Sequence, residues 1–200
     1  MTGRIARRRK LAAGLVLGAA VALPVLVPVA AARVRDDGAL RLRLRALSRG
    51  ATFLDQRDVV LQRRGNDCGP AALAMALSRL GHRASLSELS ASIPLGPRGC
   101  SLLDLLRAAE DRGARARGYR LSRRDLSTVR LPCILHLSGN HFVVAAARRA
   151  DGRIEVLDPS LGRVAYQPSI LAWRWDGNVL VFDSRAAPPG RTSGRERRFP

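Results

Sequence analysis

The stretch at residues 61–81, LQRRGNDCGPAALAMALSRLG, constrains the fold of this chain most, because it brings a cysteine to the start of a helix. Asp67 is a residue type that favours the N-cap, and Pro70 falls in the first turn, where its missing N–H costs nothing. Gly81 is a typical helix stop. The apolar positions are spaced as on one helix face: Ala71, Leu73, Ala74, Leu77 and Leu80. The sequence therefore predicts a helix that begins beside Cys68.

A cysteine at the N-terminus of a helix has an unusual chemical environment. Unpaired backbone N–H groups and the helix dipole favour an anion there, so we expect the pKa of the Cys68 thiol to fall toward the reactive range. Gln62, six residues upstream, is placed to bring an amide donor to the same point. The alternative is a buried structural cysteine on an ordinary helix.

The hydrophobic pattern changes from helical to alternating after this region. Two capping boxes, Ser85–Glu88 and Ser101–Asp104, predict helices that end near Ser92 and Arg112. The predicted strands are 115–121, 132–138, 141–147, 154–158, 163–166 and 178–183, with helical turns at 122–128 and 168–173. Residues 53–61 are expected to be a lead-in strand or a turn. This order predicts an α+β fold in which N-terminal helices pack on a C-terminal antiparallel sheet.

Two polar residues lie at the ends of predicted strands, where active-site groups are often found. His141 begins one strand and Asp158 ends another. The alternatives are a structural histidine and an aspartate that caps a local turn. A two-residue turn at 151–152 would separate the pair, so we predict a wider loop centred near Arg149 and Ala150. A β-bulge that shifts the register would also bring the two residues together.

These segments, taken together, resemble a known family, the bacteriocin-processing cysteine peptidases that remove double-glycine leaders. The residues that carry the resemblance are Gln62, Asp67–Ala71, Leu73, Met75 and Gly81, followed in the family's order by Asn140–Val144 and Leu157–Pro159. The resemblance extends from about residue 55 to residue 182 and implies a papain-like fold. The chain departs from the family's transporter-linked members, because no further membrane span or ATP-binding domain follows Ala32, and we therefore expect a free-standing member.

The resemblance assigns a role to each candidate site residue. Cys68 is expected to attack the peptide carbonyl, and His141 to protonate the leaving amine and then activate water. Asp158 is expected to orient the imidazole, and the Gln62 amide with the Cys68 N–H to form the oxyanion hole. The implied reaction is cleavage after Gly-Gly in a leader or precursor peptide. A papain-like acyltransferase or amidase and a non-catalytic peptide-binding module remain as alternatives.

The termini predict an exported protein. Residues 1–32 combine a basic start with an uncharged apolar run and are expected to be a signal peptide or an N-terminal membrane anchor, which predicts a periplasmic, extracytoplasmic or membrane-anchored location. We interpret residues 33–52 as a basic, solvated linker, with a strand, a helix or a juxtamembrane segment as alternatives. Residues 53–184 then form the peptidase domain, and residues 185–200 a disordered basic tail.

Composition removes several functional classes. The net charge is +19, yet Lys10 is the only lysine, which leaves no phosphate-binding loop of the Gly-Lys type and no Schiff-base lysine downstream. The arginines are scattered and aromatic residues are few, so we predict no specific nucleic-acid partner. The expected partner is a peptide or protein substrate, and an anionic membrane surface remains open as a second partner.

The remaining cysteines and histidines do not predict a metal site. Cys133 and His136 are three residues apart on one predicted strand and would point to opposite faces, so we predict no metal and no cofactor. Cys100 and Cys133 could form a disulfide in an oxidising compartment and leave Cys68 free. The alternative is two separate buried thiols.

Overall fold

The computed structural model describes residues 38–183 of the 200-residue chain. The chain divides into two units, residues 1–41 and residues 42–200. Of the first unit the structure describes only residues 38–41, which form the opening turn of a helix. The expected signal or anchor segment at 1–32 and the tail at 185–200 lie outside the described residues, so both stay predictions.

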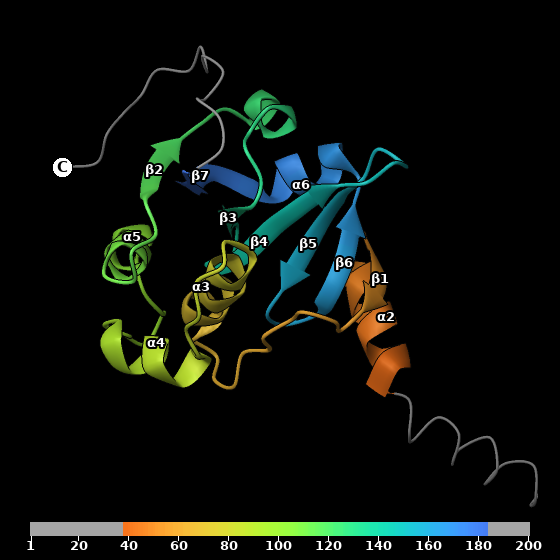
Figure 1. The fold of residues 1–200 in the computed structure, drawn as a ribbon. Helices are drawn as coiled ribbons and strands as arrows, with labels where there is room; N and C mark the ends of the chain where they lie inside the picture. The colour runs from red at the N-terminus through yellow and green to blue at the C-terminus, as the bar shows by residue number, and fades with distance from the viewer. Residues whose placement is uncertain (1–37, 184–200) are drawn as a thin grey trace, which may run out of the picture. The chain divides into compact units, whose positions relative to one another are not determined.

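A seven-stranded antiparallel sheet forms the second unit's framework, in the order β1-β6-β5-β4-β3-β7-β2 (Figure 1). Its strands are β1 (Ala51–Asp55), β2 (Ala116–Arg120), β3 (Cys133–Leu137), β4 (His141–Arg148), β5 (Ile154–Asp158), β6 (Gly162–Tyr166) and β7 (Trp175–Phe182). Strands β3 to β6 are consecutive in the chain and adjacent in the sheet. The expected C-terminal antiparallel sheet is therefore confirmed, with β1 added at one edge from before the helices.

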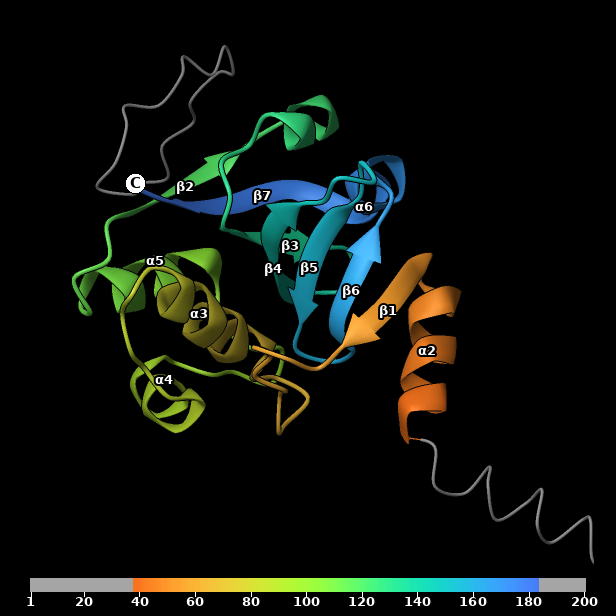
Figure 2. The same ribbon diagram turned by 45° about the vertical axis from the view of Figure 1, so that its right-hand side comes forward.

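Two helices, α3 (Cys68–Arg79) and α5 (Leu102–Glu110), pack on one face of this sheet, and α4 (Leu86–Ser92) packs against α3, as Figure 2 shows. Both capping boxes form, since the hydroxyls of Ser85 and Ser101 accept from the N–H groups of Glu88 and Asp104. Every residue from Cys68 to Leu77 is buried, because α3 lies among the other two helices and the sheet. The predicted α+β class is confirmed, and α3 proves to be a central helix rather than an amphipathic surface one.

The opposite face of the sheet has its own hydrophobic cluster. It is completed by the 3₁₀ helix η1 (Arg123–Ser127) and by α6 (Pro168–Arg174), which contribute Leu126 and Leu171. Trp175 is fully buried there, and its Nε1 donates to the carbonyl of Asn178 at 2.7 Å. Both faces of the central strands are thus covered, which explains their near-continuous apolar sequences.

For residues 33–52, the structure shows the helix alternative rather than the preferred solvated linker in the part that it describes. Residues Gly38–Ser48 form the helix α2, and Ala51 already pairs with Tyr166 as β1 joins β6. Ala46 is fully buried in the second cluster, whereas Leu44 and Leu47 are exposed. The Arg-Leu alternation has the period of a strand, so it gave no helical signal, and tertiary packing of Ala46 decided the conformation.

Among residues 38–183, no helix combines the length and the apolar character needed to cross a membrane. Helix α5 ends at Glu110 rather than near Arg112, and β7 begins at Trp175, earlier than the predicted strand at 178–183. The lead-in strand expected at 53–61 is also shifted, because β1 ends at Asp55.

Candidate active site

Helix α3 delivers Cys68 to the site as its first residue, as predicted. Asp67 occupies the N-cap position, but its side chain makes no cap hydrogen bond. Its carboxylate instead accepts from the backbone N–H groups of Arg63 (3.2 Å) and Arg64 (3.0 Å). The buried aspartate therefore folds the preceding loop back on itself, which fixes the point at which the chain enters the helix and leaves the N–H groups near Cys68 uncapped by Asp67.

Gly69 follows the cysteine because no side chain fits there. A Cβ at this position would lie 2.5 Å from the sulfur of Cys100 and 3.3 Å from both Leu105 and Phe142. The glycine thus allows α3 to pack closely against α5 and β4 beside the cysteine.

This close packing predicts a stability change. We expect Gly69→Ala to lower the free energy of unfolding by about 1–3 kcal/mol, because the new methyl group overpacks the core. Urea unfolding would measure the loss, and Gly65→Ala is the matched control, since its Cβ would meet nothing within 4 Å. A Gly69→Ala protein as stable as the Gly65→Ala control would contradict the overpacking.

His141 and Asp158 meet through the register of β4 and β5. His141 Nε2 lies 2.8 Å from Asp158 Oδ1. Near the site the strands pair Val144 with Leu157, and this register places Asp158 opposite Val143. Asp158 is therefore a diagonal neighbour of His141 on the same face, within reach of an imidazole.

A β-bulge between Ala145 and Ala147 produces this register. Without it, Asp158 would lie opposite Val144 and on the face away from His141, because a one-residue shift reverses the side chains. The loop between the strands is closed by the Arg149 N–H and the Arg153 carbonyl at 2.9 Å, so it is centred on Asp151. The loop is wider than a two-residue turn, as predicted, but its centre is Asp151 rather than Arg149 and Ala150. The bulge alternative is confirmed.

Asp158, His141 and Cys68 form a chain of contacts that stabilise charge on each group. Burial opposes the protonation of His141, but its hydrogen bonds with Asp158 and Cys68 outweigh burial and raise the pKa of His141 to about 9. Burial also opposes ionisation of Cys68, yet hydrogen bonds from His141 and from the backbone N–H groups of Phe142 and Gly69 lower the pKa of the thiol. Since Nε2 faces Asp158, the other ring nitrogen, Nδ1, faces Cys68. The arrangement favours a thiolate beside an imidazolium.

Asp158 serves the turn after β5 as well as His141. Its Oδ1 accepts from the backbone N–H of Ser160 at 2.7 Å and from the Ser160 hydroxyl at 2.8 Å. Burial raises the pKa of this carboxyl, but the hydrogen bonds with His141 and Ser160 outweigh it and keep the pKa below its usual value. The carboxylate of Asp158 therefore caps the turn and contacts His141 at the same time, and it is only 1% exposed.

Gln62 lies close to this turn, since its backbone N–H donates to the Pro159 carbonyl at 2.9 Å. Its side-chain Nε2 donates to the Arg64 carbonyl at 2.9 Å, and its Oε1 is buried without a hydrogen bond. One amide hydrogen is thus engaged within the loop, and the second is left for another acceptor.

A second histidine–carboxylate pair lies on the neighbouring strand and was missed in the sequence. His136 Nδ1 lies 2.5 Å from Asp176 Oδ2, and the ring packs against Phe142 with a centroid separation of 4.7 Å. Asn140, immediately before His141, contacts His136 and donates to the Arg98 carbonyl. The φ of Asn140 is +59°, a backbone state that asparagine tolerates.

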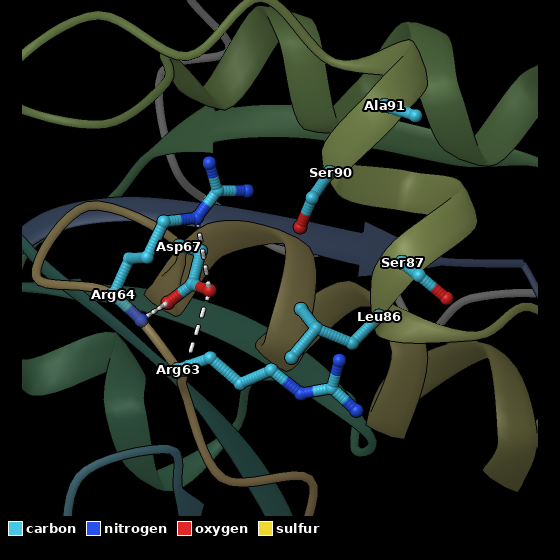
Figure 3. Close-up of a pocket in the computed structure, with 7 residues that line it drawn as sticks. All are labelled: Arg63, Arg64, Asp67, Leu86, Ser87, Ser90 and Ala91. Carbon is cyan, nitrogen blue, oxygen red and sulfur yellow. Dashed lines mark hydrogen bonds and ion pairs between the residues drawn. The ribbon is translucent and has the colours of Figure 1, made fainter.

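A cavity of about 430 Å³ opens between the loop before Cys68 and helix α4, as Figure 3 shows. Its lining residues are Arg63, Arg64, Asp67, Leu86, Ser87, Ser90 and Ala91. The Ser90 hydroxyl points into it and has no hydrogen-bond partner, although its oxygen is buried. The cavity therefore holds an unpaired hydroxyl, that of Ser90, and is lined by Asp67, the residue before Cys68.

The other two cysteines are separate, free thiols. Cys133 is fully buried in the cluster on the far face of the sheet, whereas Cys100 packs against the helical cluster. Burial raises the pKa of each thiol to about 12. The structure supports the separate-thiol alternative rather than the disulfide.

Comparisons with known proteins point to one family. The profile of the Peptidase C39 family matches residues 56–187. An uncharacterized protein of Methanothermobacter marburgensis is 33% identical over 132 residues, which cover 66% of this chain and 92% of that protein. The probable functional amyloid protease FapD of Pseudomonas aeruginosa is 36% identical over 137 residues, or 62% of this chain and 59% of that protein.

Two solved structures share the fold. One is a double glycine motif protease from an AMS/PCAT transporter in complex with the leader peptide (TM-score 0.58, 27% identity), and it matches 66% of this chain and 96% of that chain. The other is the peptidase domain of Streptococcus ComA, a bifunctional ABC transporter (TM-score 0.57, 20% identity), with coverage of 64% and 98%. The second likeness concerns the fold alone.

Proposed function

Because this chain belongs to the peptidase C39 family and is a cysteine-type peptidase, we propose that Cys68, His141 and Asp158 carry its chemistry and that it cleaves after Gly-Gly in a leader or precursor peptide. The observation that carries the proposal is the contact chain from Asp158 through His141 to Cys68, in which the pKa of the thiol is lowered and that of the imidazole raised.

The reaction begins with the Cys68 thiolate, which attacks the peptide carbonyl carbon and forms a C–S bond. The carbonyl electrons move to oxygen, and the resulting oxyanion is held by the Cys68 backbone N–H and the free amide hydrogen of Gln62. His141 gives its proton to the leaving amine as the C–N bond breaks. The imidazole then takes a proton from water, which hydrolyses the thioester and regenerates the thiolate and imidazolium. Asp158 holds the ring throughout.

Access to the thiol supports a glycine preference. Cys68 is only 6% exposed, and the His141 side chain 18% exposed, so a substrate backbone must come very close to covered atoms. Glycine has no Cβ and is the residue that permits such an approach. The solved relative with its leader peptide, a double glycine motif protease, points to the same substrate class.

Peptide cleavage tests this substrate. We expect purified protein to cut a peptide after a Gly-Gly pair, and we expect replacement of the second glycine by leucine to lower kcat/KM by roughly 100-fold or more, because the added side chain must displace packed atoms. Mass spectrometry of the products would locate the cut. Equal cleavage of the leucine peptide would contradict the glycine requirement. An added amine acceptor in the same assay distinguishes hydrolysis from acyl transfer.

We also propose that residues 1–32 direct export. The support is their basic start and apolar run, which resemble a signal or anchor. Cell fractionation followed by mass measurement of the recovered protein tests this idea. Removal of a signal peptide would leave a chain that begins near Arg33 in the extracytoplasmic fraction. An anchor would keep the whole chain in the membrane fraction.

A further inference from the structure

A residue outside the matched family region contacts the turn that holds Asp158. Arg49 precedes residues 56–187 and follows helix α2. Its Nη1 donates to the Ser160 hydroxyl at 2.8 Å and lies 3.8 Å from Asp158 Oδ2. We infer that Arg49 is a positioning residue, which holds Asp158 through Ser160 and so makes the site depend on the segment before the family region. This inference rests on the proposed function, in which Asp158 orients His141.

The hydrogen bonds run in one direction along this chain. A serine hydroxyl has one hydrogen. Because Arg49 donates to the Ser160 oxygen, that hydrogen is directed to Asp158 Oδ1, which it meets at 2.8 Å. Arg49 thereby fixes the hydroxyl in the orientation that holds the carboxylate toward His141.

The unequal surroundings of the two Asp158 oxygens give Arg49 a second effect. Oδ1 accepts from His141 and twice from Ser160, whereas Oδ2 is buried without a hydrogen bond. The Arg49 guanidinium forms an ion pair with this oxygen, with Nη1 3.8 Å from Oδ2. The guanidinium opposes rotation of the carboxylate, because rotation would move the negative charge of Oδ2 away from the positive charge of Arg49.

The position of Arg49 is itself constrained. The turn from α2 to β1 is closed by the Arg49 N–H and the Ala46 carbonyl at 3.0 Å. Gly50 follows with φ +74°, and a Cβ there would lie 2.9 Å from Ile170 on α6. The Arg49 side chain is 31% exposed, so its guanidinium is held between a packed turn and the aspartate.

The groups that face Asp158 from other elements are consistent with this role. They are His141 on β4, Arg49 after α2 and Tyr166 on β6. Burial and the charge of Asp158 raise the pKa of Tyr166, although the charges of Arg174 and Arg49 lower it. The Tyr166 hydroxyl is buried and has no hydrogen bond, so it does not replace Arg49.

The test compares Arg49→Ala, Arg49→Lys, Ser160→Ala and the double variant in the 200-residue chain. We expect Arg49→Ala to lower kcat by roughly tenfold with little change in KM, and Arg49→Lys to restore part of it. Because Arg49 acts in part through Ser160, the loss in the double variant should be smaller than the product of the two single losses. Arg153→Ala is the matched control, since Arg153 bonds Thr52 of the same segment at 2.8 Å without touching the site.

A second readout separates this inference from the proposed function. The rate at which iodoacetamide alkylates Cys68 at pH 6 needs no substrate, and we expect Arg49→Ala to slow it relative to Arg153→Ala. Unchanged alkylation and kcat in Arg49→Ala, or additive losses with Ser160→Ala, would overturn the role of Arg49. If the wild-type protein cleaves no Gly-Gly peptide, the proposed substrate fails, while alkylation still tests Arg49.

Thermal unfolding checks that each variant is folded. If Arg49→Ala is unstable, Ser160→Ala tests the same connection, because it removes the hydroxyl between Arg49 and Asp158.

Discussion

Cys68→Ala is expected to reduce peptide cleavage by at least roughly ten-thousandfold, because it removes the group that forms the covalent intermediate. The oxyanion-stabilising groups and the substrate-binding surface remain, so KM for the Gly-Gly peptide should change little. Steady-state kinetics with product detection by mass spectrometry would measure both values. The alanine removes one sulfur atom from a position that is nearly buried, and circular dichroism should show an intact fold.

Cys100→Ala is the matched control for this loss. Cys100 lies against Gly69, which follows Cys68 in the chain, but burial raises the pKa of the Cys100 thiol to about 12. It therefore stays protonated at neutral pH, and its removal should leave kcat within a few-fold of wild type. Cleavage that survives in Cys68→Ala, or that is lost equally in Cys100→Ala, would move the nucleophile away from Cys68.

His141→Ala is expected to slow the alkylation of Cys68 at pH 6 by at least about tenfold, since one pKa unit changes the thiolate fraction tenfold below the pKa. Burial raises the pKa of this thiol, and the contact with His141 is the largest opposing influence. Without the imidazole, the pKa should return toward or above its ordinary value of 9.0. Iodoacetamide labelling across pH 4–9, resolved for each cysteine by mass spectrometry, gives the midpoint.

The same pair fixes the pH dependence of cleavage. The thiolate forms as pH rises through the lowered pKa of Cys68, and the imidazolium loses its proton as pH rises through about 9. Cleavage should therefore rise on the acid side and fall near pH 9, whereas alkylation should not fall there. His82→Ala serves as the control, because His82 follows the far end of α3. Labelling of Cys68 no faster than that of Cys100 in the wild type would show that the ion pair is absent.

Sequence reasoning found the groups of the candidate site but not the contacts that hold them. Cys68 begins α3 as expected, and His141 and Asp158 meet at 2.8 Å. The expected capping by Asp67 does not occur, since its carboxylate binds the N–H groups of the loop before it. An aspartate before a helix can accept either from the N–H groups of the first helical turn or from those of the preceding loop. The sequence around it does not distinguish these two sets of donors.

Local chemistry in the sequence by itself determined the starts of α3, α4 and α5, most of the strand segments and the order of cysteine, histidine and aspartate. The helix starts depend on hydrogen bonds that close within a few residues, such as the capping boxes at Ser85 and Ser101, and the strand segments were indicated by the alternation of apolar and polar residues. Tertiary structure alone decided the bulge that turns Asp158 toward His141 and the contact of Arg49 with Ser160, which are 111 residues apart. Such contacts depend on strand register and on the closure of the whole sheet, and no local pattern specifies either.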